Sequence, residues 1–221
     1  MPNAFFFLRP RPVFLGRVLI AGSCLSLLHP VCAEELKAPL AGENIQQGQT
    51  VLFYGNSMIE RLLEHGELEA RLQIAHPKAG LQVRSLAWTG DEVGNRLRLE
   101  GYAKHMKNLL AEWPAQTIVL GYGLNESFGG AAGVEEFTSH YSIHLDQLER
   151  THPGARVVML SPIAIEGASA ERQAEVALYS QAIATLAEGR GADFVDLFSL
   201  CLLYTSPSPR DLSTSRMPSS A

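Results

Sequence analysis

Three short polar motifs in this sequence each follow an apolar run, and one of them carries a residue suited to nucleophilic attack. Ser57 has a hydroxyl that can act as a nucleophile, and it lies where a buried strand is predicted to turn into a helix. Backbone N–H groups at a helix N-terminus can stabilise negative charge that develops on an oxygen atom. Ser57 equally suits the cap of that helix, so its position alone leaves both roles open.

The other two motifs carry groups that can donate hydrogen bonds to an oxyanion. Gly90 lies in a Trp-Thr-Gly-Asp motif, where the missing side chain lets the backbone N–H approach a substrate closely. Asn125 lies in a Gly-Leu-Asn-Glu motif and offers a side-chain amide, the donor found in the oxyanion holes of some hydrolases. Taken singly, Gly90 is also an ordinary turn glycine and Asn125 an ordinary loop asparagine.

Apolar strand-like segments alternate with amphipathic helical segments and position these motifs. Strands are predicted over residues 50–54, 81–88, 117–120, 156–160 and 192–197, and helices over residues 58–72, 102–113, 135–150 and 168–188. Strict alternation favours right-handed crossovers and a parallel sheet between two layers of helices. We therefore predict a three-layer α/β/α sandwich with a five-stranded parallel sheet of the flavodoxin-like type. In such sheets ligands bind at the carboxyl ends of the strands, where the three motifs lie.

In order and spacing the three motifs resemble the SGNH/GDSL hydrolase family of serine esterases and lipases. Ser57 matches the first block of the family, Gly90 the second and Asn125 the third. The resemblance covers residues 50–197 and implies the SGNH-hydrolase fold. It also implies that Ser57 attacks an ester carbonyl to form an acyl-enzyme, while the N–H groups of Ser57 and Gly90 and the amide of Asn125 hold the oxyanion.

The substrate class that we expect is a carbohydrate O-acetyl ester, with lipid esters, thioesters and peptidoglycan acetyl groups as alternatives. Trp88 and Tyr122 can stack on a sugar ring, or simply pack against the edge of the sheet. Asp91 and Glu126 can orient a substrate hydroxyl, or lie solvated in their loops. Glu126 and Asn56 stand where the family usually has Asp, which affects fine tuning rather than the chemistry.

The general base of the family is a histidine in a C-terminal Asp-x-x-His block, and this sequence has no histidine after His152. His140 and His144 have a spacing that suits zinc, but no carboxylate motif accompanies them, so we expect a solvated helix face and no metal or cofactor. The remaining histidines of the domain are interpreted as surface residues: His65, His76, His105 and His152.

Both ends of the chain are expected to lie outside the domain. Residues 1–33 are typical of a secretory signal peptide, with arginines before a short apolar run and small residues at the cleavage site. An N-terminal membrane anchor is the alternative, and residues 21–24 match a lipoprotein box only weakly. Residues 34–49 are then a linker, and residues 50–200 are an exported, periplasmic or secreted, hydrolase-type domain without its last block.

Residues 201–221 have a different character from the preceding sequence. Cys-Leu-Leu-Tyr-Thr-Ser-Pro-Ser-Pro-Arg-Asp and the final Ser-Arg-Met-Pro-Ser-Ser-Ala resemble translated sequencing-adapter DNA. We therefore expect an adapter-derived, disordered tail, with a natural Ser/Pro-rich tail as the alternative. The native protein would then continue past Leu200 into an Asp-x-x-His block, and the chain as written would be nearly inactive. The competing class is a non-catalytic carbohydrate-binding module of a longer exported protein.

Composition and charge exclude other classes of protein. The 221 residues are 46% hydrophobic and 19% charged, as in a globular domain and unlike disordered or collagen-like chains. A net charge of -5 disfavours nucleic acid as a partner. The domain itself has no cysteine, so its stability must come from its core alone. We expect a small-molecule or carbohydrate ester as partner and no stable membrane association after signal cleavage, while the oligomeric state stays open.

Overall fold

The computed structural model describes residues 47–96, 104, 108–110 and 112–205. A parallel sheet of five strands, in the order β2-β1-β3-β4-β5, lies at the centre of this part of the chain. The strands are β1 (Thr50–Gly55), β2 (Gln82–Ser85), β3 (Thr117–Gly121), β4 (Arg156–Leu160) and β5 (Asp193–Val195). The predicted sheet is therefore confirmed, although β2 and β5 are shorter than expected.

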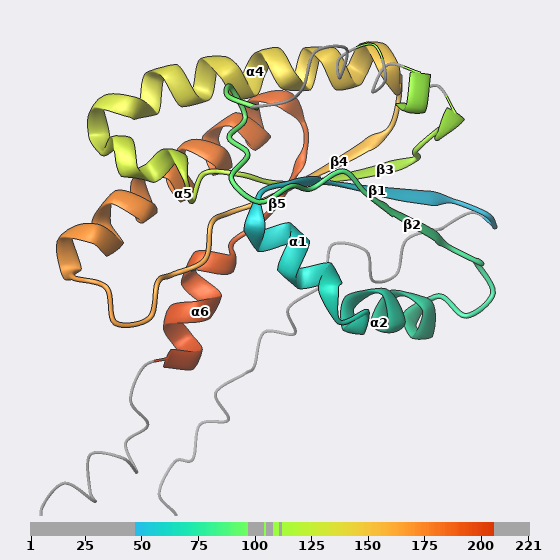
Figure 1. Ribbon diagram of the computed structural model, residues 1–221, viewed down its shortest axis with the longest axis horizontal. Coiled ribbons are helices and arrows are strands. Elements are labelled where there is room, and N and C mark those ends of the chain that lie inside the picture. The colour runs from blue at the N-terminus through green and yellow to red at the C-terminus, as the bar shows by residue number, and fades with distance from the viewer. Residues whose placement is uncertain (1–46, 97–103, 105–107, 111, 206–221) are drawn as a thin grey trace, which may run out of the picture. The chain divides into compact units, whose positions relative to one another are not determined.

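Helices cover both faces of the sheet (Figure 1). One face is covered by α4 (Val134–Thr151) and α5 (Ala170–Arg190), and the other by α1 (Ser57–Glu64), α2 (Glu67–Ala75) and α6 (Leu197–Thr205). The helix predicted over residues 102–113 lies largely outside the described residues, but residues 104, 108–110 and 112 are helical. None of the described helices is long and apolar enough to span a membrane. The three-layer α/β/α sandwich is confirmed.

Two predictions about helices are wrong in detail. The single helix expected over residues 58–72 is two helices, because Gly66 adopts a left-handed φ of 67° that a continuous α-helix does not accommodate. Disorder was expected from Cys201 onward, but the residues up to Thr205 belong to α6. Residues 206–221, like the predicted signal peptide and most of the predicted linker, lie outside the described residues.

The core forms two layers, one on each face of the sheet, because successive side chains of a strand point to opposite faces. The layer beneath α4 and α5 contains fully buried strand residues: Leu52, Ile118, Leu120 and Met159. The opposite layer contains the alternate strand residues, which pack against α1 and α2: Val51, Phe53, Val119 and Val158. Burial on both faces explains why these strands appear in the sequence as continuous apolar runs.

The strand order has its switch point between β1 and β3. The chain leaves β1 to form β2 on one side and then returns to form β3 on the other side of β1. In a parallel sheet of this order, ligands bind outside the carboxyl ends of the strands at this switch point. Ser57 follows β1 and Asn125 follows β3, so both residues follow the strands at this switch point.

A pair of glycines lets α1 start close to the end of the sheet. Gly55 and Gly121 are register partners at the carboxyl ends of β1 and β3. A Cβ atom on Gly55 would lie 2.5 Å from the carbonyl oxygen of Gly121 and 2.5 Å from Cγ1 of Ile59. A Cβ on Gly121 would likewise lie 2.5 Å from the Ile59 side chain. The first turn of α1, which begins at Ser57, is therefore positioned by two residues that lack side chains.

Gly55→Ala is expected to lower the free energy of unfolding by about 1–3 kcal/mol, because the obstructing Gly121 oxygen is backbone and cannot rotate away. Urea unfolding measures the change. Gly189→Ala in α5 is the matched control, since a Cβ there meets nothing within 4 Å and alanine favours a helix. A Gly55→Ala variant as stable as the wild type would contradict this packing argument.

Candidate active site

Ser57 is the first residue of α1 and follows directly on the turn that ends β1. The helix is capped by Asn56, whose Oδ1 accepts a hydrogen bond from the backbone N–H of Met58 at 3.1 Å. Asn56 is buried, whereas the Ser57 side chain is half-buried. The interpretation of Ser57 as the helix cap is therefore wrong. Its own N–H belongs to the first turn of α1, where backbone donors have no partner within the helix.

The loop that contains Gly90 is held against the start of α1 by two hydrogen bonds. The N–H of Trp88 donates to the carbonyl oxygen of Gly55 at 3.0 Å. Oγ1 of Thr89 donates to Oε2 of Glu60 in α1 at 2.5 Å. Gly90 itself is exposed, has a φ of 84°, and would meet nothing within 4 Å if it carried a Cβ. The backbone at Gly90 is consequently open to a ligand beside the first turn of α1.

Asn125 reaches from the end of β3 to the same loop. Its Nδ2 donates a hydrogen bond to the carbonyl oxygen of Asp91 at 3.2 Å. An amide NH₂ group has two hydrogens, so one remains available for an oxyanion. The structure thus brings Asn125 to the Gly90 loop, and hydrogen bonds join that loop to the start of α1 at Ser57.

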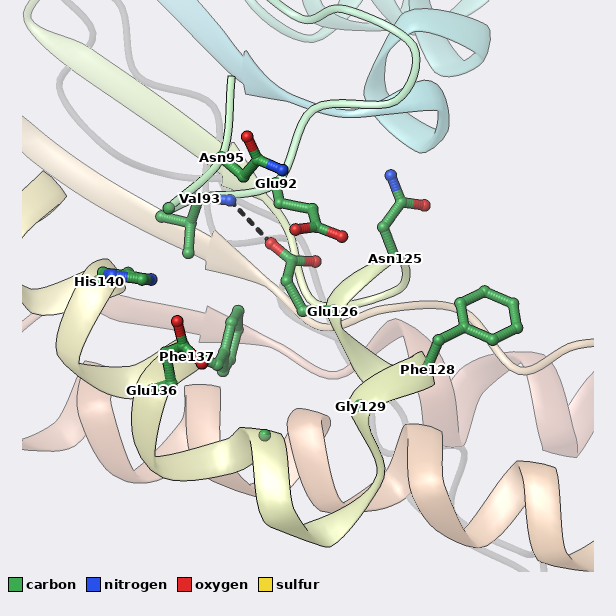
Figure 2. A pocket seen from close by; sticks show the side chains of 12 residues that line it. Glu92, Val93, Asn95, Asn125, Glu126, Phe128, Gly129, Glu136, Phe137 and His140 are labelled. Atoms are coloured by element: carbon green, nitrogen blue, oxygen red, sulfur yellow. Dashed lines mark hydrogen bonds between the residues drawn. The ribbon is translucent and has the colours of Figure 1, made fainter. Parts of the chain in front are cut away.

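Glu126 joins the loops after β2 and β3 and is not the solvated acid that the sequence suggests. Its Oε1 accepts a hydrogen bond from the N–H of Val93 and its Oε2 accepts one from the N–H of Gly123, each at 2.8 Å. Figure 2 shows the bond to Val93. Burial raises the pKa of Glu126 above its ordinary value, against the effect of these backbone hydrogen bonds. Glu126 therefore fixes the position of its neighbour Asn125 relative to the Gly90 loop.

Two of the predicted substrate-binding residues are buried. Asp91 is 3% exposed and Tyr122 is 1% exposed. Tyr122 packs edge-on against Tyr141 and His144, with ring centroids 5.9 Å apart in each pair. The Tyr122 ring therefore belongs to the core under α4, and a contact of either residue with substrate stays a prediction. Trp88, by contrast, is 61% exposed, and its contact with substrate stays a prediction.

The histidines also differ from expectation. His144 is buried, and its burial together with the nearby charge of Arg96 lowers its pKa to about 3, so the ring is neutral at physiological pH. His152 is buried too, with Nε2 3.2 Å from the carbonyl oxygen of Trp113. Both were expected on the surface. His105 lies outside the described residues.

A cavity of about 510 Å³ opens beside Asn125 (Figure 2). Its walls come from the loop after β2, from η1 (Glu126–Gly129) and from the start of α4. Sequence reasoning missed most of the lining residues as site residues, because no motif connects them and only the fold brings them together; those that follow β3 include Phe128, Glu136 and His140. The one feature that these three residues share in the sequence is that they follow β3, as Asn125 does.

Replacing Glu126 with glutamine is expected to change how stability depends on pH. The raised pKa means that the folded protein binds the Glu126 proton more tightly than the unfolded chain. The stability that this proton contributes to the folded protein is therefore fully present below the ordinary pKa of 4.5. It is lost as the pH rises through the pKa of Glu126 in the folded protein, by at most about 1.4 kcal/mol per pH unit. Glutamine does not titrate, so the variant lacks this pH-dependent contribution to stability.

Urea unfolding of both proteins between about pH 4 and pH 7 measures this difference. The wild type is expected to lose stability relative to Glu126→Gln as the pH rises. Glu136→Gln is the control, because Glu136 lines the same cavity but is exposed. A stability difference between the wild type and Glu126→Gln that does not vary with pH would contradict a raised pKa of Glu126 in the folded protein.

Comparisons with known proteins agree with this architecture. Residues 53–216 match the GDSL-like lipase/acylhydrolase family. Two catalytic mutants of Axe2, an acetylxylan esterase from Geobacillus stearothermophilus, are similar in structure. One has a TM-score of 0.59 and 16% identity, with 74% of this chain and 84% of that chain covered. The other has a TM-score of 0.60 and 16% identity, with 80% and 90% covered.

The acetyl xylan esterase AlAXEase is also similar, with a TM-score of 0.56, 18% identity, and 75% of this chain and 83% of that chain covered. No curated protein matches the sequence. The structural likeness supports the fold, and the family match spans well over half of the chain, including all three motifs. The chain belongs to the GDSL-like lipase/acylhydrolase family of ester-bond hydrolases.

Proposed function

We propose that this protein is an exported carbohydrate O-acetyl esterase that works through an acyl-enzyme on Ser57. The observation that carries this proposal is the set of hydrogen bonds at the carboxyl edge of the sheet. The N–H of Trp88 donates to the carbonyl oxygen of Gly55 and Asn125 donates to that of Asp91, which supports a site where the proposed nucleophile and the two proposed donors come from neighbouring segments. Nucleophilic acyl transfer needs this combination.

In the proposed mechanism, Oγ of Ser57 attacks the ester carbonyl carbon and passes its proton to a histidine base. The negative charge on the carbonyl oxygen is held by the N–H groups of Ser57 and Gly90 and by the free amide hydrogen of Asn125. Collapse of this intermediate expels the sugar alcohol, which takes the proton back, and leaves Ser57 acylated. Water activated by the same histidine then attacks the acyl group and releases the acid.

The histidine base and its Asp are proposed to come from an Asp-x-x-His block in the native sequence beyond Leu200. Among the described histidines, His144 has both ring nitrogens buried, and His152 bonds to the backbone of Trp113. The sequence after His152 contains no histidine, and residues 201–221 resemble adapter DNA.

A carbohydrate acetyl ester is the proposed substrate because three features favour it. The solved structures with the same fold include acetylxylan esterases. Trp88 lies exposed beside Gly90, where its ring can meet a sugar. The acidic chain, with its net charge of -5, disfavours anionic polymers as substrates.

Residues 1–33, with the pattern of a signal peptide, would carry the enzyme out of the cytoplasm.

The experiment that tests the proposal is to read the gene past codon 200. An Asp-x-x-His block in frame within a few tens of residues is the expected result. If the native frame contains no such block, the second candidate applies: a non-catalytic module that keeps the cleft for binding carbohydrate. The observation in favour of that candidate is the lack of any histidine after His152.

A further inference from the structure

Two exposed aromatic side chains lie at the carboxyl edge of the sheet. Trp88 follows β2 and is 61% exposed, and Phe128 lies in η1, after β3, and is 77% exposed. The other large apolar side chains that are exposed in this part of the chain are aliphatic, and all of them lie on helices: Leu62, Ile74, Ile143, Leu178 and Leu202. Trp88 precedes Gly90 by two residues and Phe128 follows Asn125 by three, so both rings belong to the loops that carry the proposed oxyanion donors.

Phe128 is held in place although it is exposed. The guanidinium carbon of Arg172, in α5, lies 3.9 Å from the centre of the Phe128 ring. Arg172 also donates hydrogen bonds to the carbonyl oxygen of Ser127 at 2.8 Å and to that of Leu124 at 3.4 Å. It forms an ion pair with Glu175 at 2.9 Å, which balances its charge. One face of the ring is thus covered by a fixed cation, and ordering the ring costs little when a ligand binds.

The cavity beside Phe128 has the size and lining of a ligand site. Its volume of about 510 Å³ lies within the range of small-molecule pockets. Figure 2 shows Asn125 and Phe128 on one side of Glu126, with Glu136 and His140 on the other side. A ligand that fills the cavity therefore extends away from Asn125, and its end beside that amide lies near the proposed oxyanion hole.

The charges that line the cavity are mostly negative. Three carboxylates line it, those of Glu92, Glu126 and Glu136, against the one imidazole of His140. Glu126 already accepts hydrogen bonds from two backbone N–H groups, so Glu92 and Glu136 remain as acceptors for ligand hydroxyls. A carboxylate on the ligand would meet like charge in a partly enclosed site, where repulsion is stronger than in bulk water.

We propose that this cavity is a glycosyl subsite that binds uncharged pyranose units, with Phe128 as its stacking platform, and that its carboxylates exclude uronic acids. The inference rests on the proposed esterase function and names the part of the substrate that the subsite selects. The apolar C–H face of a neutral sugar packs on the free face of the ring, and its hydroxyls donate to Glu92 and Glu136.

The test measures binding by calorimetry on the full chain, with xylotriose and trigalacturonic acid as probes. Xylotriose is expected to bind, and Phe128→Ala is expected to weaken it about tenfold, while Phe128→Tyr stays near the wild type. Ile74→Ala is the matched control, because Ile74 is also 77% exposed but lies on α2. A double variant that combines Glu92→Gln and Glu136→Gln is expected to bind trigalacturonic acid more tightly than the wild type does, without binding xylotriose more tightly.

The proposal is overturned if xylotriose does not bind, if Phe128→Ala binds it as the wild type does, or if Ile74→Ala loses as much affinity. It is also overturned if trigalacturonic acid binds the wild type as tightly as xylotriose. Since the ligands carry no ester, these outcomes do not depend on catalysis. If xylotriose binding depends on Phe128 but Ser57 proves not to be a nucleophile, the glycosyl subsite stands and the proposed esterase function is rejected.

Discussion

Loss of the histidine base is expected to have the largest effect on activity. The 221-residue chain should hydrolyse p-nitrophenyl acetate close to background, whereas the protein continued through an Asp-x-x-His block should turn it over rapidly. Without the base, Ser57 is an un-ionised hydroxyl. Loss of one triad member removes most of the rate and leaves about 10³-fold over water from the oxyanion hole and binding. Initial rates of the two proteins, measured side by side, provide the comparison.

Ser57→Ala in both proteins is the control for this comparison. In the protein that continues through the Asp-x-x-His block, this substitution should reduce the rate of p-nitrophenyl acetate hydrolysis to that of the 221-residue chain. In the 221-residue chain it should change the rate little. Robust turnover by the 221-residue chain that disappears with Ser57→Ala would contradict the account. Another group would then act as the base, and the assignment of a histidine beyond Leu200 would have to be abandoned.

Asn125→Ala in the continued protein is expected to lower kcat by about 100-fold or more with little change in KM. The proposed amide contact to the oxyanion would form mainly in the transition state, so its loss should slow the chemical step rather than weaken substrate binding. Steady-state kinetics on p-nitrophenyl acetate separate the two parameters.

Asn95→Ala is the matched control for Asn125→Ala. Asn95 also lines the cavity with an amide, but it lies in the loop after β2, away from the end of β3. Its removal should leave kcat within a few-fold of the wild type. An increase in KM with unchanged kcat in Asn125→Ala would make Asn125 a contact of the bound substrate instead of an oxyanion donor. Urea unfolding of both variants checks that lost hydrogen bonds, such as that from Asn125 to Asp91, have not loosened the fold.

The sequence allowed the sheet to be predicted because its strands are buried on both faces and therefore appear as unbroken apolar runs. The location of Ser57, Gly90 and Asn125 at one edge followed from that sheet, since the carboxyl ends of parallel strands lie together. The break at Gly66 was missed because apolar residues continue at helical spacing through it. A single left-handed φ angle at this glycine ends the helix without changing the hydrophobic pattern.

Burial of polar residues could not be predicted from their types. Asp91 and Glu126 look like loop acids, yet Asp91 is buried, and Glu126 accepts hydrogen bonds from two backbone N–H groups that only the folded chain brings to it. Tyr122 follows β3 directly and is buried beneath α4 with His144. The signal for His144 was available, because Tyr141 and His144 share the apolar face of α4 at helical spacing. Phe128 could not be predicted as a site residue because the contact that holds its ring comes from Arg172, which is distant in sequence.

The central claim, that Ser57 is the nucleophile, is tested most directly by covalent labelling. The protein continued through its native sequence is treated with a fluorophosphonate, digested and analysed by mass spectrometry. The account predicts one adduct, on the peptide that contains Ser57, and its disappearance in Ser57→Ala. Labelling that survives Ser57→Ala, or an adduct on a different serine, would contradict it.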